Sequence, residues 1–243
     1  RPASRDQRVE TSDPLPMNYS KQTMTEKQLW RVDLHAHTIF SKDSLTHVQA
    51  LIDRARAVGL HRIAVTEHNR LDGALRAKEL APDLVIVGEE VKTSTGGEII
   101  AYFLKQPIPK GLTPRETIAR MREQDAFITI PHPLDSLRRS AMGMEETLKI
   151  IDLVDALEVR NARCVRPADN DAALALARTH GKLMTAGSDA HIPFELGHCY
   201  MEMPPFEENA ASFAAALALG APAGQVSPFW PHLLSTWAKI RKR

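Results

Sequence analysis

Short apolar runs alternate with longer segments of helical periodicity from residue 30 onward. Apolar and β-branched runs of about five residues, bounded by turn-forming residues, are typical of buried strands. Their alternation with helical segments predicts βα units around a parallel sheet. Seven strands are expected, at residues 30–34, 62–66, 84–88, 98–104, 126–130, 155–159 and 182–186.

Four helices are expected between and after these strands. The first, at 46–58, has Thr46 as its N-cap, and the second, at 113–124, begins with Thr113 and Pro114. The third, at 167–181, ends at Gly181, and an alanine-rich helix spans 207–220. Residues 89–97 are too few for a helical crossover between the third and fourth strands, so these two strands are expected to be antiparallel or the barrel locally irregular.

The composition is that of an ordinary soluble protein. The 243 residues are 43% hydrophobic and 25% charged, enough for one α/β barrel or two small domains. Thirty-one Lys and Arg against 30 Asp and Glu give a formal net charge of +1. This balance gives no global electrostatic reason to bind a long nucleic acid, so a phosphate-bearing ligand must be held locally.

The two cysteines, Cys164 and Cys199, lie far apart and outside any CxxC pattern. They indicate neither a disulfide scaffold nor a thiolate zinc site, and favour a reducing cytoplasmic location. Residues 1–29 are polar, lack an apolar signal segment and predict a flexible tail, in which Met17 or Met24 is a candidate native start. Since no apolar run approaches about 18 residues, we expect no membrane span.

Side chains that can bind metal follow most of the predicted strands. Carboxyl ends of barrel strands converge on one rim, so these side chains are expected to share one cavity. A single histidine beside a strand is commonly a hydrogen-bonded core or surface residue, but independent placement does not repeat at so many strand ends. Imidazole and carboxylate together suit Zn, Mn or Fe. The residues are His35, His37, Glu67, His68, Glu89, Glu90, His132, Glu158, Asp189 and His191.

Five segments, "DLHAHTIFSKDS", "VTEHN", "VGEEV", "PHP" and "GSDAH", occur in this order at predicted strand ends. They resemble the successive motifs of the PHP (polymerase and histidinol phosphatase) domain family, over residues 31–204. The resemblance implies an α/β fold, a distorted (β/α)7 TIM-like barrel with metal at the strand ends. The barrel would span 30–205, with a C-terminal helical extension packing on it at 206–243.

The resemblance also implies two or three divalent ions, Zn, Mn or Fe. Family ligand positions fall on three groups of residues, and the glutamate of the third motif that faces the ions is Glu90, with Glu89 facing away. The first ion would be bound by His35, His37, Glu90 and Asp189, the second by Asp43, His68 and His191, and the third by Glu90, as a bridge, with His132.

Two positions depart from the family pattern. Many members carry a further histidine on the fourth strand, where this chain has Glu98. Glu98 would either replace that ligand or lie behind the ligands, with the third ion weak or absent. Asp43 stands where the family often has Asp-Gly or histidine, and would either bind the second ion or cap the next helix.

Adjacent divalent ions lower the pKa of a bridging water and hold phosphoryl oxygens during in-line displacement. The expected enzyme is therefore a metal-dependent phosphoesterase that hydrolyses a small-molecule or nucleotide phosphate with a metal-bridging hydroxide. Asp43 and His191 are candidate catalytic residues. Further candidates are the phosphate-binding arginines and three polar residues, namely Arg138, Arg139, Arg160, Arg163, Asn69, Asn161 and Glu158, the last orienting a histidine.

Three further functions remain open. A nuclease acting on oligonucleotide ends would share the metal centre, but no basic stripe with interleaved aromatics favours long nucleic acid. An amidohydrolase-type C–N hydrolase would favour a metal-bridging lysine, for which Lys92 is the nearest candidate. A non-catalytic metal-binding module would be expected to have lost ligands. The sequence predicts no oligomeric state.

Apolar residues recur at helical spacing near the C-terminus, before a basic end. We expect this helix to dock on the barrel, although it could instead form a dimer contact, a lid beside the site or a membrane-surface helix. The apolar residues are Trp230, Leu233, Leu234, Trp237 and Ile240.

Overall fold

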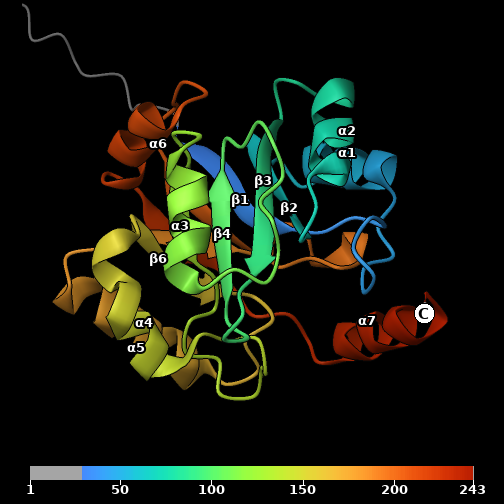
Figure 1. The fold of residues 1–243 in the computed structure, drawn as a ribbon. Helices are drawn as coiled ribbons and strands as arrows, with labels where there is room; N and C mark the ends of the chain where they lie inside the picture. The colour runs from blue at the N-terminus through green and yellow to red at the C-terminus, as the bar shows by residue number, and fades with distance from the viewer. Residues whose placement is uncertain (1–28, 243) are drawn as a thin grey trace, which may run out of the picture.

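The computed structural model describes residues 29–242 (Figure 1). The predicted tail therefore lies almost entirely outside the described residues. The strands are β1 (Trp30–Ala36), β2 (Arg62–His68), β3 (Val85–Lys92), β4 (Glu98–Tyr102), β5 (Phe127–Ile130), β6 (Ala156–Asn161), β7 (Leu183–Gly187), β8 (Cys199–Met203) and β9 (Ala221–Gly224). The helices are α1 (Val48–Ala57), α2 (Asp72–Leu80), α3 (Pro114–Arg122), α4 (Gly143–Ile150), α5 (Pro167–Thr179), α6 (Ala210–Leu217) and α7 (Trp230–Arg241), with short 3-10 turns at Ile151–Leu153 and Pro193–Glu195.

The strands form one curved sheet in the order β7-β6-β5-β4-β3-β2-β1-β8-β9. β4 is antiparallel to both β3 and β5, as the short connection before it predicts, whereas β1, β2 and β3 are parallel, as are β5, β6 and β7. The sheet nearly closes where a parallel bridge joins Ala36 to Ala190, just after β7. There the Asp189 amide donates to the carbonyl of His35 at 2.7 Å. The predicted distorted α/β barrel is confirmed.

Two strands and two helices of the described chain have no counterpart in the sequence prediction. β8 pairs antiparallel with β1, and β9 with β8. β9 is "APAG", whose small residues and proline carry no strand signal. The C-terminal extension therefore contains a strand as well as helices. The helices α2 and α4 are short, nine and eight residues, and neither has a side chain capping its N-terminus.

Local signals account for two helix boundaries and fail at a third. Thr113 forms a capping box with Glu116 at the start of α3, and Gly181, with φ of 60°, follows the end of α5. By contrast, α1 begins at Val48, and its N-cap, His47, makes no side-chain capping bond. Neither Thr46 nor Asp43 caps α1, so the capping role considered for Asp43 is wrong.

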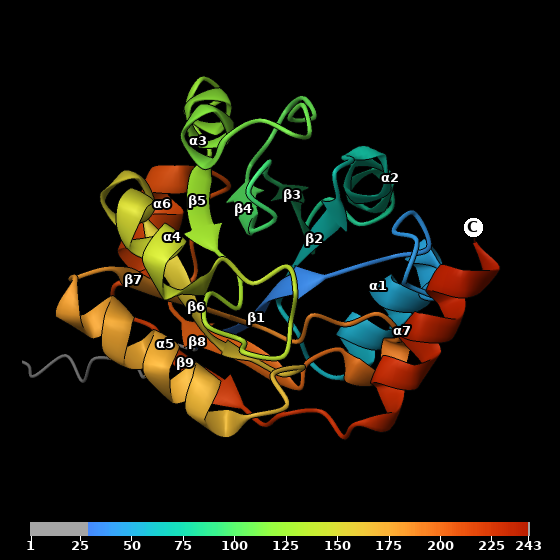
Figure 2. The ribbon, with the colours of Figure 1, turned by 60° about the horizontal axis from the view of Figure 1, so that its bottom comes forward.

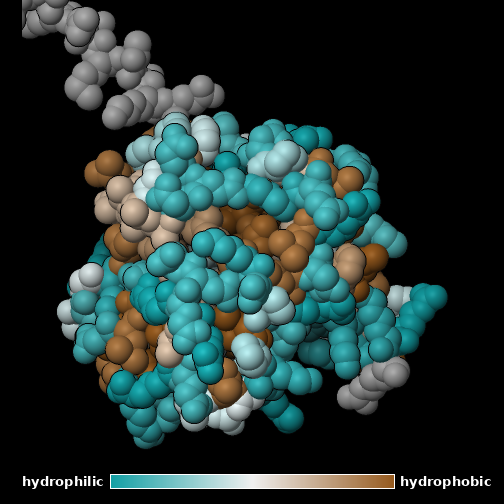
Figure 3. All heavy atoms as spheres, turned by 45° about the horizontal axis from the view of Figure 1, so that its top comes forward, coloured by the Kyte–Doolittle hydropathy of each residue, from teal (hydrophilic) through white to brown (hydrophobic). Residues whose placement is uncertain are grey.

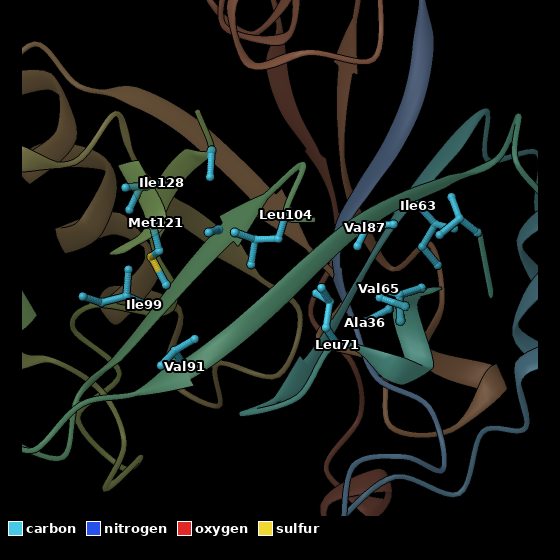
Figure 4. Close-up of a cluster of buried hydrophobic side chains, with 14 of the residues drawn as sticks. Ala36, Ile63, Val65, Leu71, Val87, Val91, Ile99, Leu104, Met121 and Ile128 are labelled. Atoms are coloured by element: carbon cyan, nitrogen blue, oxygen red, sulfur yellow. The ribbon is translucent and has the colours of Figure 1, made fainter. Parts of the chain in front are cut away.

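Two apolar cores hold the barrel wall in place. The larger core lies between the sheet and helices α1 to α5, and Figure 4 shows some of its side chains, among them Ile63, Val87 and Met121. The second core joins the strands to α6, where Phe213 makes edge-to-face contacts with Tyr102 and Phe127. Figure 1 shows α6 at the end of the barrel away from the carboxyl ends of the parallel strands, such as β3. Apolar packing thus leaves the carboxyl-end rim to polar residues.

One face of the molecule is largely hydrophilic. In the view of Figure 3, hydrophilic residues cover most of the face, and hydrophobic residues show mainly in the hollows between them. Among residues 29–242, no helix combines the length and the apolar character that crossing a membrane requires.

Candidate metal centre

Strands β1, β2 and β3 run further than their apolar segments predict, and the extra residues include His35, His68 and Glu90. β2 continues to His68 and β3 to Lys92, so that His68 and Glu90 are register partners near the ends of neighbouring strands. Figure 2 looks from the side onto which these carboxyl ends open. All nine predicted ligands gather there, namely His35, His37, Asp43, His68, Glu90, Glu98, His132, Asp189 and His191.

The first group combines two histidines with two carboxylates. His35 lies in β1 and His37 directly after it, Glu90 lies in β3, and Asp189 lies in the loop after β7. Nε2 of His35 lies 3.1 Å from Nε2 of His37. Oε2 of Glu90 is 3.4 Å from each of these nitrogens, and Oδ1 of Asp189 is 3.6 and 3.3 Å from them. Two imidazole nitrogens and two carboxylate oxygens that converge in this way match the donor set of a single cation.

The second group faces the solvent side of the first. Asp43 places Oδ2 3.5 Å from Nε2 of His68, and Oδ1 3.5 Å from Nε2 of His191. The ring of His37 lies 4.4 Å, centroid to centroid, from the rings of both His68 and His191. Asp43, His68 and His191 are therefore adjacent, as the resemblance implies for a second ion.

The third group centres on Glu90 and includes Glu98. Oε1 of Glu90 lies 3.0 Å from Nε2 of His132, and its Oε2 lies 3.0 Å from Nδ1 of His68. Glu98 reaches within 3.8 Å of both histidines. It can do so because β4 is antiparallel, which brings the first residue of β4 to the rim where the parallel strands end. This placement favours Glu98 as a ligand rather than a supporting residue.

The donor set fits divalent cations. Buried carboxylate oxygens without hydrogen-bond partners are costly in a folded protein and call for a specific explanation. In the described part of the chain, four such oxygens lie in this cluster: Asp43 Oδ1, Glu90 Oε2, Glu98 Oε2 and Asp189 Oδ1. Ligation of two or three divalent ions would satisfy all four at once.

Protonation in the metal-free cluster differs from ligand to ligand. Despite burial, Asp189 and Glu158 hold the pKa of His35 well above its ordinary value, and Glu90 and Asp43 do the same for His68, so a bound ion must displace a proton from each of these rings. Burial, together with His68 and His191, lowers the pKa of His37 to about 3, so its imidazole is neutral near pH 7 and keeps a lone pair. Burial alone raises the pKa of Glu90, but His35 and His68 outweigh it and hold that pKa well below its ordinary value. A neutral imidazole and an ionised carboxylate are the forms that bind metal.

Backbone strain marks two ligand positions. His132 has φ of 30° and Asp189 has φ of 52°, in the left-handed region that non-glycine residues rarely occupy. Such conformations cost about 1–3 kcal/mol each and persist where the surrounding structure imposes them. The rim therefore holds both side chains in positions that the local chain does not prefer.

Glu158 orients the candidate ligands His35 and His132 through hydrogen bonds, as predicted for a histidine. Its Oε1 lies 3.0 Å from Nδ1 of His35, and its Oε2 accepts the His132 amide at 2.7 Å and Nδ2 of Asn161 at 2.9 Å. Asn161 also donates to Oδ2 of Asp189 at 3.3 Å. Asn161 thus supports ligands instead of facing the cleft, where it was expected to meet substrate.

Two supporting residues, Asp33 and Gly187, were not predicted, and a third, Glu67, was predicted only as one of the side chains at the rim. Glu67 is buried and accepts hydrogen bonds from Thr38 and Ser41, which fixes the loop after β1. Asp33, two residues before His35, accepts the Ser188 amide at 2.9 Å, and burial raises its pKa to about 6. The i, i+2 spacing of Asp33 and His35 was the available signal.

Gly187 is the second unpredicted supporting residue. An added Cβ there would lie 2.4 Å from Cβ of His35 and 2.6 Å from its backbone nitrogen. This close approach lets β7 pass beside β1 at the first ligand of the cluster.

The structure separates the candidate arginines. Arg138 places Nη1 2.7 Å from Oδ2 of Asp189, and Arg163 is buried with Nη2 2.7 Å from Oγ of Ser235. The expectation that Arg160 reaches the site is wrong, because its Nη1 donates to the Gly224 carbonyl at 3.0 Å. A register shift in β6 between Glu158 and Arg160 turns Arg160 away from the rim.

A cleft of about 1600 Å³ opens over the cluster. Asp43, His68, Glu98 and His191 form part of its floor, and Asn69 lines it with Oδ1 bonded to the Lys92 amide at 2.9 Å. Eight basic residues line the cleft against four acidic ones. They are Lys42, Arg70, Lys92, Lys110, Arg138, Arg139, Arg163 and Lys239 against Asp43, Asp72, Glu98 and Asp135.

Two curated relatives come from Methanocaldococcus jannaschii, and both are uncharacterized. MJ0417 is 35% identical over 175 residues, which cover 71% of this chain and 70% of that protein. MJ1587 is 36% identical over 146 residues, covering 54% of this chain and 82% of that protein.

Solved structures share the fold at low identity. A two-domain Bacteroides vulgatus protein containing a predicted PHP-like metal-dependent phosphoesterase superposes with a TM-score of 0.67 at 20% identity, covering 81% of this chain and 65% of its own. PsfC of Pseudomonas syringae gives 0.63 at 18%, covering 88% and 98%. The lesion-specific endonuclease Q of Pyrococcus furiosus gives 0.58 at 17%, covering 80% and 57%.

The family models match most of the barrel. The PHP domain model matches residues 33–186, and a PHP-associated model matches residues 167–222. The first match includes the candidate ligands from His35 to His132, and the second includes Asp189 and His191 in the loop after β7. The chain belongs to the PHP domain family.

Proposed function

We propose that this protein is a metal-dependent phosphoesterase that hydrolyses a phosphate ester of a small molecule or nucleotide. One observation carries the proposal: three adjacent ligand groups, two of which share Glu90, lie under a cleft whose charged lining is mainly basic. Clustered ligands suit more than one divalent ion, and a basic cleft above them suits an anionic substrate.

Divalent ions bound here would supply an activated water and would neutralise phosphoryl oxygens. The chain's own residues would hold and orient the substrate. Arg138 is the cation nearest the first group and lines the cleft, so it is the candidate to hold a phosphoryl oxygen. Asp43 and His191 also line the cleft, which makes the second group the part of the cluster that a substrate meets first.

Turnover by the loaded protein tests the proposal. Protein loaded separately with Mn, Zn or Fe should hydrolyse members of a panel of phosphomonoesters and nucleotides. His35→Ala and Asp189→Ala should abolish hydrolysis while a surface variant of matched type, His180→Ala, should retain it, because His180 lies outside the cluster. Absence of turnover across the panel, with at least two ions bound per chain, would refute the proposal.

A nuclease acting on oligonucleotide ends is the second candidate. The cleft is larger than a single phosphomonoester requires, and its eight basic residues are more than one phosphate needs. Both features favour this candidate. Short single-stranded oligonucleotides with a free or phosphorylated end would distinguish the two functions. Release of mononucleotides, without hydrolysis of free phosphomonoesters, would select the nuclease.

A C–N hydrolase and a non-catalytic module have less support. Lys92 is exposed and, among residues 29–242, makes no ion pair with the cluster, so it does not favour a lysine-bridged C–N hydrolase. A non-catalytic module is disfavoured because the ligand set is intact. Metal content of an untreated preparation distinguishes it, since less than one ion per chain would favour the module.

We further propose a reducing, cytoplasmic location. Cys164 and Cys199 are both buried as free thiols, and burial raises the pKa of Cys199 to about 12. Proteins of oxidising compartments more often pair such residues as disulfides. Thiol titration of the unfolded protein from its native host should find both cysteines reduced.

A further inference from the structure

The C-terminal helix α7 docks beside the candidate metal ligands through a face that is mostly not apolar. Only Pro231, Ser235 and Ala238 of this helix are buried. The large side chains of Leu233, Trp237 and Ile240 and of two neighbours remain exposed, so the amphipathic pattern does not place its apolar stripe against the barrel. In Figure 1, α7 lies on the carboxyl-end side of the barrel, below the segment that joins β1 to α1.

Polar contacts fix α7 to the loops that carry the ligands. Nζ of Lys242 donates to three carbonyls of the loop after β1, those of Ile39, Ser41 and Ser44, at 2.9, 3.0 and 2.6 Å. Arg163, from the loop after β6, donates to Oγ of Ser235. These hydrogen bonds fix the position of α7 relative to the loop that contains Asp43.

This docking places Lys239 at the second ligand group. Nζ of Lys239 lies 3.1 Å from Oδ2 of Asp43, the oxygen that faces His68. The Lys239 side chain is 60% exposed and lines the cleft, so its ammonium reaches the cluster from the solvent side. The Lys239 ammonium has three N–H donors, and the Asp43 carboxylate cannot accept from all three in one geometry. At least one donor is therefore left for another acceptor.

A lysine in this position opposes the binding of a divalent cation by Asp43, since like charges this close repel each other. An anion that bridges the lysine ammonium and the divalent cation removes that repulsion. Arg138 stands in the same relation to Asp189, the carboxylate of the first group, at 2.7 Å. The two candidate ligand aspartates therefore each carry a basic partner that lines the cleft, one from a barrel loop and one from α7.

We propose that Lys239 binds the phosphoryl group of the substrate, so that helix α7 completes the substrate-binding site. The inference rests on the proposed phosphoesterase function for the identity of the anion. Arg138 and Lys239 would hold phosphoryl oxygens from two sides of the cluster. Lys239 is a binding residue in this scheme, and the surface pairing with Asp43 is its resting contact.

Binding of inorganic phosphate to the full chain loaded with Mn tests this directly by calorimetry. Lys239→Ala should weaken phosphate binding about tenfold or more, the loss expected for a charge-assisted hydrogen bond. Lys239→Arg should recover most of the affinity. The matched control is Arg241→Ala, because Arg241 carries the same charge on the same helix but stacks over Trp237, outside the cleft.

Manganese affinity supplies the second readout. We expect Mn to bind Lys239→Ala as tightly as it binds the wild type, or more tightly, because an opposing charge is gone. In turnover, Lys239→Ala should raise KM with little change in kcat, as removal of a ground-state contact does.

The inference is overturned if Lys239→Ala binds phosphate like the wild type, if the loaded wild type binds no phosphate, or if Mn affinity falls as far as phosphate affinity. The last outcome would make Lys239 a support for Asp43. Phosphate binding that depends on Lys239 without hydrolysis of any phosphoester would uphold the inference and refute the proposed function. Hydrolysis with phosphate binding independent of Lys239 would do the reverse.

Discussion

Glu158 Oε1 lies 3.0 Å from Nδ1 of His35, while Nε2 of the same ring points into the metal cluster. Once a metal ion displaces the second proton of His35, this pairing fixes the tautomer, because the proton held on Nδ1 leaves the lone pair on Nε2. Carboxylates in this position orient ligating histidines and raise their basicity. Glu158 also accepts the amide of His132, so one carboxylate aligns two candidate ligands.

Glu158→Gln should therefore lower metal affinity by about 10–100-fold without unfolding the protein. Glutamine keeps the size of the side chain, but its amide group cannot serve both acceptor roles with the same charge. Competition with a chromophoric chelator measures the affinity, and circular dichroism checks the fold. Glu123→Gln, on the exposed surface, is the control and should bind metal like the wild type.

Glu98→Ala should reduce the number of bound ions by one per chain. Among the described residues, Glu98 pairs with His132 of the third group and His68 of the second at 3.8 Å, and it meets the first group only at the shared Glu90. Metal analysis after gel filtration gives the count. An unchanged count would place Glu98 behind the ligands instead of among them.

Gly187→Ala should destabilise the fold by about 1–3 kcal/mol, as overpacked substitutions do. The added Cβ would meet backbone and Cβ atoms of His35, which cannot move without displacing β1. Urea unfolding measures the loss. Gly111→Ala is a useful contrast, because Gly111 has open space around its Cβ and its cost comes from a φ of 80° alone.

Arg138→Ala and Arg160→Ala should differ sharply in turnover. Arg138 contacts Asp189 and lines the cleft, so its removal should lower kcat/KM by about 100-fold, as for loss of a charged group at a phosphoryl site. Arg160 instead bonds the Gly224 carbonyl, and its variant should stay within about twofold of wild type, like other surface substitutions. Similar losses in both variants would contradict this assignment.

Strand-end chemistry could be predicted from sequence because barrel geometry converts chain order into spatial proximity. His35, His68 and Asp189 each lie at or just beyond a strand's carboxyl end, so their meeting needs only the arrangement of β1, β2 and β7 around one rim. The antiparallel β4 follows from a connection too short for a crossover. Because β4 is antiparallel, its first residue, Glu98, lies at the rim where the parallel strands end.

Features set by tertiary context were not predictable. Arg160 lies near the end of a strand in sequence, yet a register shift within β6 turns it outward. The apolar stripe of α7 predicts a docking face, but polar contacts from Lys242 and Arg163 decide which side faces the barrel. Likewise, a net charge of +1 does not reveal that basic residues concentrate at one cleft.

The central claim is that clustered metal ions on this rim hydrolyse a phosphate ester. Its most direct test measures ion content and phosphomonoester turnover on the same preparations of wild-type protein and Asp189→Asn. We predict at least two ions per chain with turnover in the wild type, and loss of both turnover and ions of the first group in the variant. Undiminished turnover in Asp189→Asn, or after complete removal of metal by chelation, would contradict the account.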